Sequence, residues 1–418
     1  MPPAAKKRAF FFILATILIN MIGVGIAWPV LPKLVQSMGS GSISEAASTY
    51  AIVGILFALG QFFFSPLIGM LSDKYGRRPI LLISLAGLSA DYLLTAIAPT
   101  IFVLAIARLV GGIFGATIST ANAYIADISS PEDRAKNFGY IGAAFGLGFI
   151  LGPALGGFLG EIDVRLPFFA AAALAALNVI FGYIALPETL ELENRRPLDI
   201  KQASPFASLR RIAAFPMLVP LLASLFITAT AQRGLETIWV LYTEFRFEWT
   251  LTQATNSLVF VGVLYFVVQG FLVKPIVKKL GEWRTVITGF FISAIAMGLY
   301  GLASQGWMVY PLVALYALGN GIGGPALNAI CSKTVHADMQ GQLQGTLNSI
   351  NAVGVIVGPF CASMVLAHVA SEMPIINLPG AWFLLSAVIF LIATLLMVRS
   401  ANKLAALLKQ KAATDNNP

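Results

Sequence analysis

The stretch Gly69-Met-Leu-Ser-Asp-Lys-Tyr-Gly-Arg-Arg78 sets the organisation of this chain, because it places a short charged turn between two long apolar runs. Those runs cover residues 47–70 and 80–98. Gly76 lets the backbone bend sharply, since glycine has no Cβ atom. Asp73 is placed to interact with a helix end and with nearby cations. The stretch therefore predicts two helices joined by a tight, charged turn.

The composition of the whole chain extends this pattern. Hydrophobic residues make up 58% of the 418 positions and charged residues only 11%, whereas soluble proteins have about 45–50% and about 25%. So little charge cannot cover a water-soluble globule, and we expect an all-α membrane protein. At about 20 apolar residues per crossing, the sequence predicts twelve transmembrane helices, at 10–31, 47–70, 80–98, 101–126, 137–160, 165–186, 213–240, 253–275, 285–303, 307–333, 340–368 and 378–398.

The basic residues indicate the orientation of these helices, because short cytoplasmic loops retain Lys and Arg. Most of the 27 Lys and Arg residues lie in the two tails and in one set of loops. Only Lys33, Arg165 and Arg246 fall in the opposite set, and Arg108 and Arg233 fall within spans. Both termini are therefore expected in the cytoplasm.

An internal repeat divides the chain into two six-helix halves. At an offset of about 206 residues, a series of small and polar residues recurs in order: Gly115, Asn122, Gly139, Gly148, Gly152 and Pro153 as Gly321, Asn328, Gly345, Gly354, Gly358 and Pro359. We expect a first half at 1–186, a cytoplasmic linker at 187–211, a second half at 212–399 and a cytoplasmic tail at 400–418. Parallel halves of this kind are typical of secondary transporters, whose substrate site lies between them near the bilayer midplane.

Several other functions are not indicated. The basic residues do not form a patch with interleaved aromatic residues, so no nucleic-acid partner is expected. Cys331 and Cys361 lack CxxC spacing, and His336 and His368 are isolated, so neither a metal site nor a cofactor is expected. The sequence shows no pairing of a nucleophile with a base, so it does not indicate an enzyme.

The stretch from Gly69 to Arg78 resembles the GxxxDxxGRR signature of the major facilitator superfamily. The resemblance implies the major facilitator fold, with two pseudo-symmetric six-helix halves. It also implies that Asp73, Arg77 and Asp127 form a charge cluster that holds the two halves together on the cytoplasmic side. The gating residues in this region would be Gly69, Asp73, Gly76, Arg77, Arg78 and Asp127. In the corresponding part of the second half, Lys278 stands where the first half has Asp73.

A second motif lies in the predicted fifth helix and resembles one associated with proton-coupled exporters. Its small residues allow neighbouring helices to approach closely, and its proline bends the helix. A role in packing alone, without meaning for export, is the alternative. The residues concerned are Gly148, Gly152, Pro153, Gly156 and Gly157.

Further matches along nearly the whole chain resemble the tetracycline/proton antiporters. They comprise Gln61, Ser72-Asp73, Asp91-Tyr92, Ala123-Tyr-Ile-Ala-Asp127, Glu132-Asp-Arg134 and Gly341-Gln-Leu-Gln-Gly345. The resemblance implies a monomeric transporter in the bacterial inner membrane that exports a small organic molecule in exchange for protons. A proton-coupled importer of an organic nutrient or a metal chelate is the alternative. A membrane receptor or assembly factor that has kept the fold but lost transport is a third hypothesis, which the intact charged turn and the charges within the spans disfavour.

Four ionisable residues fall within spans, where a charge costs at least a few kcal/mol and therefore marks a functional candidate. Asp91 is the first candidate for proton coupling, because burial favours the protonated form of a carboxyl group. A structural role, as a capped or ion-paired carboxylate, is the alternative. Arg108 cannot release a proton at ordinary pH, so it would tune a neighbouring acid or hold an anion. Glu236 is the other candidate acid. Its spacing to Arg233 is i, i+3, so the two could also form a plain ion pair.

Polar side chains at similar depth offer a lining for a substrate site. Many amides and few fixed charges suit a neutral or zwitterionic solute. The predicted substrate-binding residues are Asn20, Gln61, Asn122, Gln232, Arg233, Tyr265, Gln269, Asn320, Asn348 and Asn351.

The chain also departs from the antiporters that it resembles. Those exporters carry an acidic residue in helix one, a histidine in helix eight and an acidic residue in helix nine. The matching positions here are Asn20, Tyr265 and Ser293. Because a metal-chelated cationic drug needs such groups, tetracycline is predicted to be a poor substrate or none.

Overall fold

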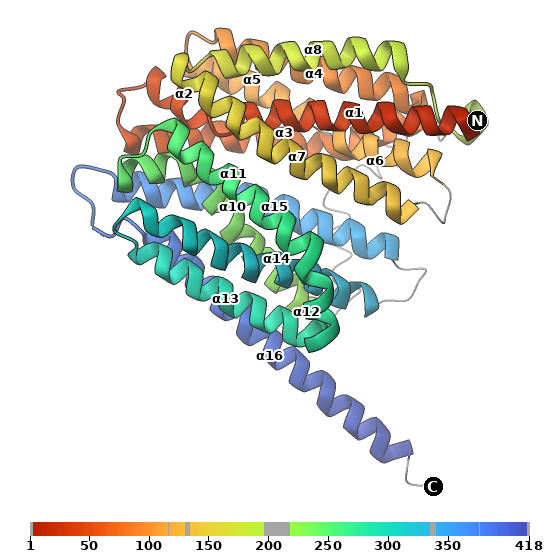
Figure 1. Ribbon diagram of the computed structural model, residues 1–418, viewed down its shortest axis with the longest axis vertical. Coiled ribbons are helices and arrows are strands. Elements are labelled where there is room, and N and C mark those ends of the chain that lie inside the picture. The colour runs from red at the N-terminus through yellow and green to blue at the C-terminus, as the bar shows by residue number, and fades with distance from the viewer. Residues whose placement is uncertain are drawn as a thin grey trace. The chain divides into compact units, whose positions relative to one another are not determined.

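The computed structural model describes residues 3–115, 117–129, 134–195, 218–334, 340–375 and 377–415. Within these ranges the regular structure is helical and contains no strand, as Figure 1 shows. The all-α prediction is confirmed for this part of the chain. Residues 196–211 of the predicted linker lie outside the described residues.

Each span predicted in the first half falls on observed helix. The elements are α1 (Pro3–Ala27), α2 (Leu31–Met38), α3 (Ile43–Tyr75), α4 (Arg77–Ile97), α5 (Ile101–Phe114), α6 (Thr117–Ile128), α7 (Arg134–Ile162), α8 (Leu166–Ala185) and the short η1 (Leu192–Asn194). The span predicted at 101–126 is divided into α5 and α6 near Gly115. Gly111 and Gly112 stand just before this break, and glycine has the weakest helix propensity after proline.

The second half follows the same pattern. Its elements are α10 (Val219–Phe247), α11 (Leu251–Val267), η5 (Val268–Leu272), α12 (Val273–Leu280), α13 (Glu282–Leu302), η6 (Gly306–Met308), α14 (Val309–Lys333), α15 (Gln340–Val369) and α16 (Ala381–Asp415). The segment η5 is a π-helix that joins α11 to α12. Such π segments inside α-helices occur frequently at functional sites.

Two glycine turns show how the internal repeat appears in the structure. Gly76 ends α3 with a φ of 107°, and Gly281 ends α12 with a φ of 77°. Both values lie where a side chain would be strained. The helices that follow, α4 and α13, each have 21 residues. The charged turn at Gly76 and its counterpart at Gly281 therefore have the same local structure.

Side-chain caps fix other helix starts. The Ser42 hydroxyl accepts a hydrogen bond from the Glu45 backbone N–H at the start of α3. The Thr100 hydroxyl does the same for the Val103 N–H at the start of α5. Such caps satisfy backbone donors that have no partner within the helix.

Nine helices in the described part of the chain are long and apolar enough to cross a membrane. Three predicted spans do not meet this measure. The range 101–126 is divided into α5 and α6, α10 carries Arg233 and Glu236, and α14 is interrupted by polar and small residues such as Asn320 and Gly324. The count of twelve spans therefore stays a prediction.

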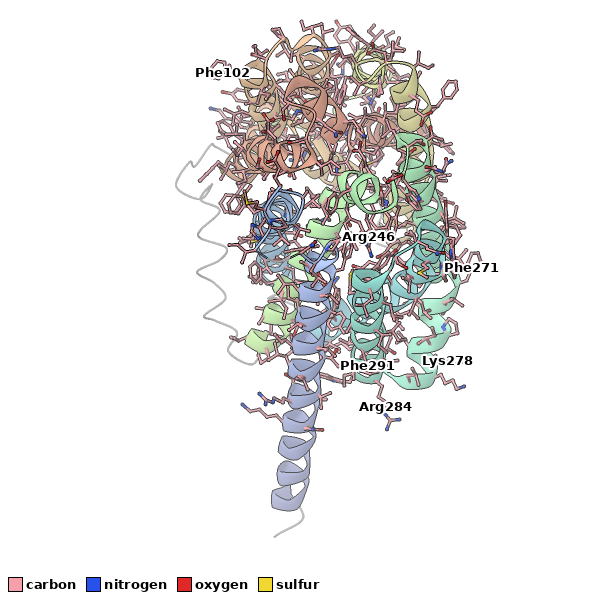
Figure 2. The ribbon with its side chains drawn as sticks, turned by 90° about the vertical axis from the view of Figure 1, so that its left-hand side faces the viewer. Phe102, Arg246, Phe271, Lys278, Arg284 and Phe291 are labelled. Carbon is pink, nitrogen blue, oxygen red and sulfur yellow. The ribbon has the colours of Figure 1, made fainter. Side chains whose placement is uncertain are left out.

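Large apolar side chains cover the outer faces of these helices. Phe102 on α5 is 74% exposed and Phe271 on η5 is 64% exposed, and both project outward in Figure 2. Exposed apolar patches on this scale are rare in soluble monomers. They fit a protein whose helices face lipid.

The contacts within the chain define two compact units. Unit 1 contains Met1–Pro205, Ile238–Val263 and Leu366–Ile375, and unit 2 contains Phe206–Thr237, Leu264–Val365 and Ile376–Pro418. Unit 1 thus includes the predicted first half together with the end of α10 and most of α11. The predicted domain boundaries at 186/187 and 211/212 stay predictions.

Candidate functional site

A buried ion pair joins α4 to α5 inside unit 1. The Arg108 Nη2 atom lies 2.5 Å from Asp91 Oδ1 and donates a second hydrogen bond to the Thr95 hydroxyl at 2.8 Å. The side chains of Arg108 and Asp91 are only 7% and 1% exposed. Asp91 and Arg108, both predicted proton-coupling residues, are therefore direct partners.

Further contacts surround this pair, although the Arg108 Nε atom is buried without a hydrogen-bond partner among the described residues. Arg108 also lies over the Phe57 ring, 5.9 Å from its centre, in a cation–π contact. The second carboxyl oxygen of Asp91, Oδ2, is buried without a hydrogen-bond partner among the described residues. Gly111 on α5 packs directly against this carboxyl group and leaves no room for a Cβ atom. Oδ2 is thus an open acceptor position beside a fixed cation.

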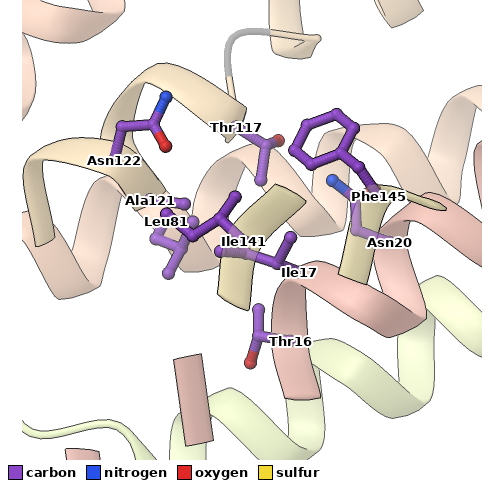
Figure 3. A pocket seen from close by; sticks show the side chains of 9 residues that line it. All are labelled: Thr16, Ile17, Asn20, Leu81, Thr117, Ala121, Asn122, Ile141 and Phe145. Carbon is purple, nitrogen blue, oxygen red and sulfur yellow. The ribbon is translucent and has the colours of Figure 1, made fainter. Parts of the chain in front are cut away.

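Two predicted substrate-binding residues, Asn20 on α1 and Asn122 on α6, line one pocket in unit 1. Figure 3 shows their amides on either side of this pocket. Its remaining lining is mainly apolar, with the hydroxyl-bearing Thr16 and Thr117 as further polar members. Its volume of about 10 Å³ is roughly the room that one water molecule needs, so the pocket in this state is too small for an organic solute. Gln61 on α3 does not line it and instead donates to the Gly115 carbonyl at 3.4 Å.

A second polar network lies in unit 2 and crosses three helices. Asn320 on α14 donates from Nδ2 to Gln232 Oε1 at 3.0 Å and to the Tyr265 hydroxyl at 2.8 Å. Gln232 on α10 then donates to Glu236 Oε1 at 2.9 Å. Arg233 donates to Glu236 Oε2 at 2.7 Å. Five of the residues predicted to form the site are thus connected in one chain of hydrogen bonds.

Three further predicted substrate-binding residues belong neither to the pocket nor to this network. Gln269 lies in η5 and is exposed, and Asn348 and Asn351 are exposed on α15. Their predicted role in binding stays a prediction.

The charged turn after α3 brings together the cluster expected from the family signature. Arg77 pairs with Asp73, donates from Nε to Asp127 at 3.1 Å and donates from Nη1 to the Ser72 hydroxyl at 2.8 Å. All of these residues lie in unit 1, so the observed cluster joins α3, α4 and α6. The expectation that it also holds the second half stays a prediction.

Sequence reasoning missed Glu188, which it assigned to the linker. Its carboxylate accepts from the backbone N–H groups of Arg77 and Arg78 at 2.9 and 3.2 Å. A negative charge at these first N–H groups of α4 is stabilising, because they carry the positive end of the helix dipole. Arg78 meanwhile donates to the Tyr183 carbonyl on α8 at 2.6 Å. Only the return of the chain after α8 brings Glu188 to this turn, and no local motif signals it.

The glycine motif on α7 lies against α1, as its small residues predicted. A Cβ atom on Gly152 would lie 2.5 Å from the Cα atom of Gly25, and Gly148 and Gly156 pack as closely on the same helix. Pro153, which lies inside α7, also faces Gly25. Gly157 instead faces Thr255 on α11. The close approach of neighbouring helices is confirmed, whereas Gly69 has open space around its Cα atom.

Comparisons with known proteins agree with this architecture. A tetracycline resistance protein of class C from Escherichia coli is 39% identical over 367 residues, which cover 88% of this chain and 91% of the relative. Multidrug resistance protein 2 of Bacillus subtilis (strain 168) is 28% identical over 358 residues, 85% of this chain and 88% of the relative.

A solved structure gives a similar result. The human organic anion transporter MFSD10 superposes with a TM-score of 0.71 at 26% identity, covering 95% of this chain and all of that one. The sequence profile of the Major Facilitator Superfamily matches residues 13–359. This chain therefore belongs to the Major Facilitator Superfamily of membrane transporters.

Proposed function

We propose that this protein is a proton-coupled secondary transporter that exports a small organic molecule by alternating access. Its similarity to a tetracycline resistance protein and to a multidrug resistance protein supports export of a drug-like or metabolite-like solute. The absence of acidic or imidazole groups at Asn20, Tyr265 and Ser293 supports a substrate other than tetracycline. The expected setting is a bacterial inner membrane, with twelve spans, a monomeric protein and both termini in the cytoplasm.

The observation that supports proton coupling is the buried ion pair of Asp91 and Arg108. A carboxylate in a span is costly unless it is paired or protonated. Asp91 has both options, since Arg108 stabilises the ionised form and the free Oδ2 atom can take a proton. Arg108 keeps Thr95 and the Phe57 ring as partners when Asp91 becomes neutral. The pair can therefore change its net charge without leaving the arginine unsupported.

The cluster of Asp73, Arg77 and Asp127 would serve gating, together with the glycine motif on α7. In this proposal the ion pairs around Arg77 stabilise one of the two access states. Gly148, Gly152, Gly156 and Gly157 would let α7 slide against its neighbours during the change of state.

Transport in everted membrane vesicles tests the proposed function. Vesicles from an efflux-deficient bacterial host that produces the protein receive ethidium or Nε-dansyl-lysine, and ATP hydrolysis acidifies their interior. An exporter accumulates at least one probe, a protonophore abolishes this accumulation, and Asp91→Asn vesicles show none. Proton-dependent uptake by intact cells, without accumulation in everted vesicles, would instead establish import.

A further inference from the structure

We propose that Arg233 and Glu236 are a receptor for a zwitterionic substrate, with the substrate's carboxylate on Arg233 and its ammonium group on Glu236. This inference rests on the proposed transport function and names the substrate class that the transporter carries. It arises from the difference between the two ion pairs that lie within predicted spans, and from the hydrogen bonds that hold one of them.

The two pairs differ in their access to a solute. Arg108 and Asp91 are 7% and 1% exposed, and a molecule larger than water cannot reach them. Arg233 and Glu236 are 49% and 25% exposed. The buried Asp91–Arg108 pair can exchange a proton, and the exposed Arg233–Glu236 pair can bind an organic ion.

Hydrogen bonds from α14 and α10 also fix the orientation of the Arg233–Glu236 pair, which an ordinary ion pair on a helix surface lacks. Both hydrogens of the Asn320 amide are used, one on Tyr265 and one on Gln232. This fixes the Gln232 amide so that its nitrogen faces Glu236 Oε1. The carboxylate of Glu236 is thus oriented from α14 through α10. Binding groups need such preorganisation, because a group that must be ordered on binding loses affinity.

Unused donors remain on the pair. The guanidinium group of Arg233 has five N–H donors, of which one is bonded to Glu236. The other donors of this half-exposed side chain can bind a carboxylate.

The charge of the site selects the class of solute. Arg233 and Glu236 together are neutral, so an anion or a cation bound here would leave one charge unbalanced within a predicted span, where an unpaired charge is costly. A zwitterion replaces one internal pair by two pairs with the solute and leaves the net charge unchanged. The planar fork of arginine binds a carboxylate through two parallel hydrogen bonds, and a carboxylate accepts from an ammonium group.

A set of four related probes tests the proposal. Nε-Dansyl-lysine is zwitterionic at neutral pH, its methyl ester is a cation, its Nα-acetyl derivative is an anion, and the doubly blocked compound is neutral. Binding to the purified protein in detergent is followed by dansyl fluorescence. The zwitterion should bind about tenfold or more tightly than each of the other three, since it alone forms both charge-assisted contacts.

Two variants should change, in opposite ways, which of the four probes binds most tightly. Arg233→Gln removes the carboxylate contact, so the methyl ester should bind it best. Glu236→Gln removes the ammonium contact, so the Nα-acetyl compound should bind it best. Arg284→Gln, an exposed arginine on α13 outside the network, should keep the wild-type order. Gel filtration and thermal unfolding show whether each variant is folded.

Several results would overturn the proposal. They are equal binding of the four probes, tightest wild-type binding of the Nα-acetyl anion, no binding of dansyl-lysine, or an order that neither variant changes. The assay uses no proton gradient and leaves Asp91 intact, so a failure of proton coupling would not affect it. Conversely, ethidium transport that depends on Asp91 would persist if only the zwitterion site were wrong.

Discussion

Replacement of Gly152 by alanine tests the close packing of α1 against α7. The added Cβ atom would lie 2.5 Å from Cα and 2.7 Å from the carbonyl carbon of Gly25. Ordinary contacts of a Cβ atom begin at 3.4 Å, so the two helices must separate by about 0.9 Å. Because both sides of the contact are backbone, no side chain can move aside. Overpacking of this kind costs about 1–3 kcal/mol.

Gly146→Ala on the same helix is the matched control. A Cβ atom there has nothing within 4 Å, so the change should stabilise α7 by about 0.5–1 kcal/mol through helix propensity. Both variants gain this propensity, so they should differ by the overpacking cost, about 1–3 kcal/mol in the free energy of unfolding. Reversible unfolding of the purified protein in mixed micelles with increasing sodium dodecyl sulfate measures this difference by circular dichroism. Equal stability of the two variants would refute the packing described for α1 and α7.

Three further predictions concern the charged turn and the substrate. Arg77→Gln should slow probe transport about tenfold or more at equal protein level, because it removes charge-assisted hydrogen bonds to Asp73 and Asp127. Arg399→Gln, at an exposed arginine on α16, should keep the wild-type rate as the control, and an unchanged rate in Arg77→Gln would remove the gating role. Glu188→Gln should lower the free energy of unfolding by about 0.3–2 kcal/mol, since a negative charge at the start of α4 is lost. Thermal unfolding measures the loss of stability, and equal stability of the variant and the wild-type protein would show that the charge is not needed. Expression in a susceptible, efflux-deficient host should leave tetracycline resistance unchanged, and a large rise that depends on Asp91 would contradict that expectation.

The positions of the helices could be predicted from the sequence, because apolar runs and charged turns are local signals. The ion pair of Arg233 and Glu236 could also be predicted from the sequence, since residues three positions apart on a helix face each other. The structure confirms their contact at 2.7 Å. The break near Gly115 was not predicted, because hydropathy alone does not register a loss of helix propensity.

Contacts between distant residues were beyond the sequence. Asn320 and Gln232 are 88 residues apart, and their hydrogen bond depends on how α14 packs beside α10. Glu188 reaches the start of α4 only because the chain returns there after α8. Asp91 and Arg108 were both identified as functional candidates, but their direct contact follows from the packing of α4 on α5. Such pairings need a tertiary structure, and no spacing rule gives them.

The protonation of Asp91 is the most direct test of the proposed proton coupling. Infrared difference spectra of the reconstituted protein, recorded while the pH is lowered, report the carbonyl stretch of a newly protonated carboxyl group without the need for a known substrate. Proton binding at Asp91 predicts a band that appears in the wild-type protein, persists in Glu236→Gln and is absent from Asp91→Asn. Identical spectra of the wild-type and Asp91→Asn proteins across the pH range in which both are folded would contradict it, because Asp91 would then stay paired with Arg108 and carry no proton.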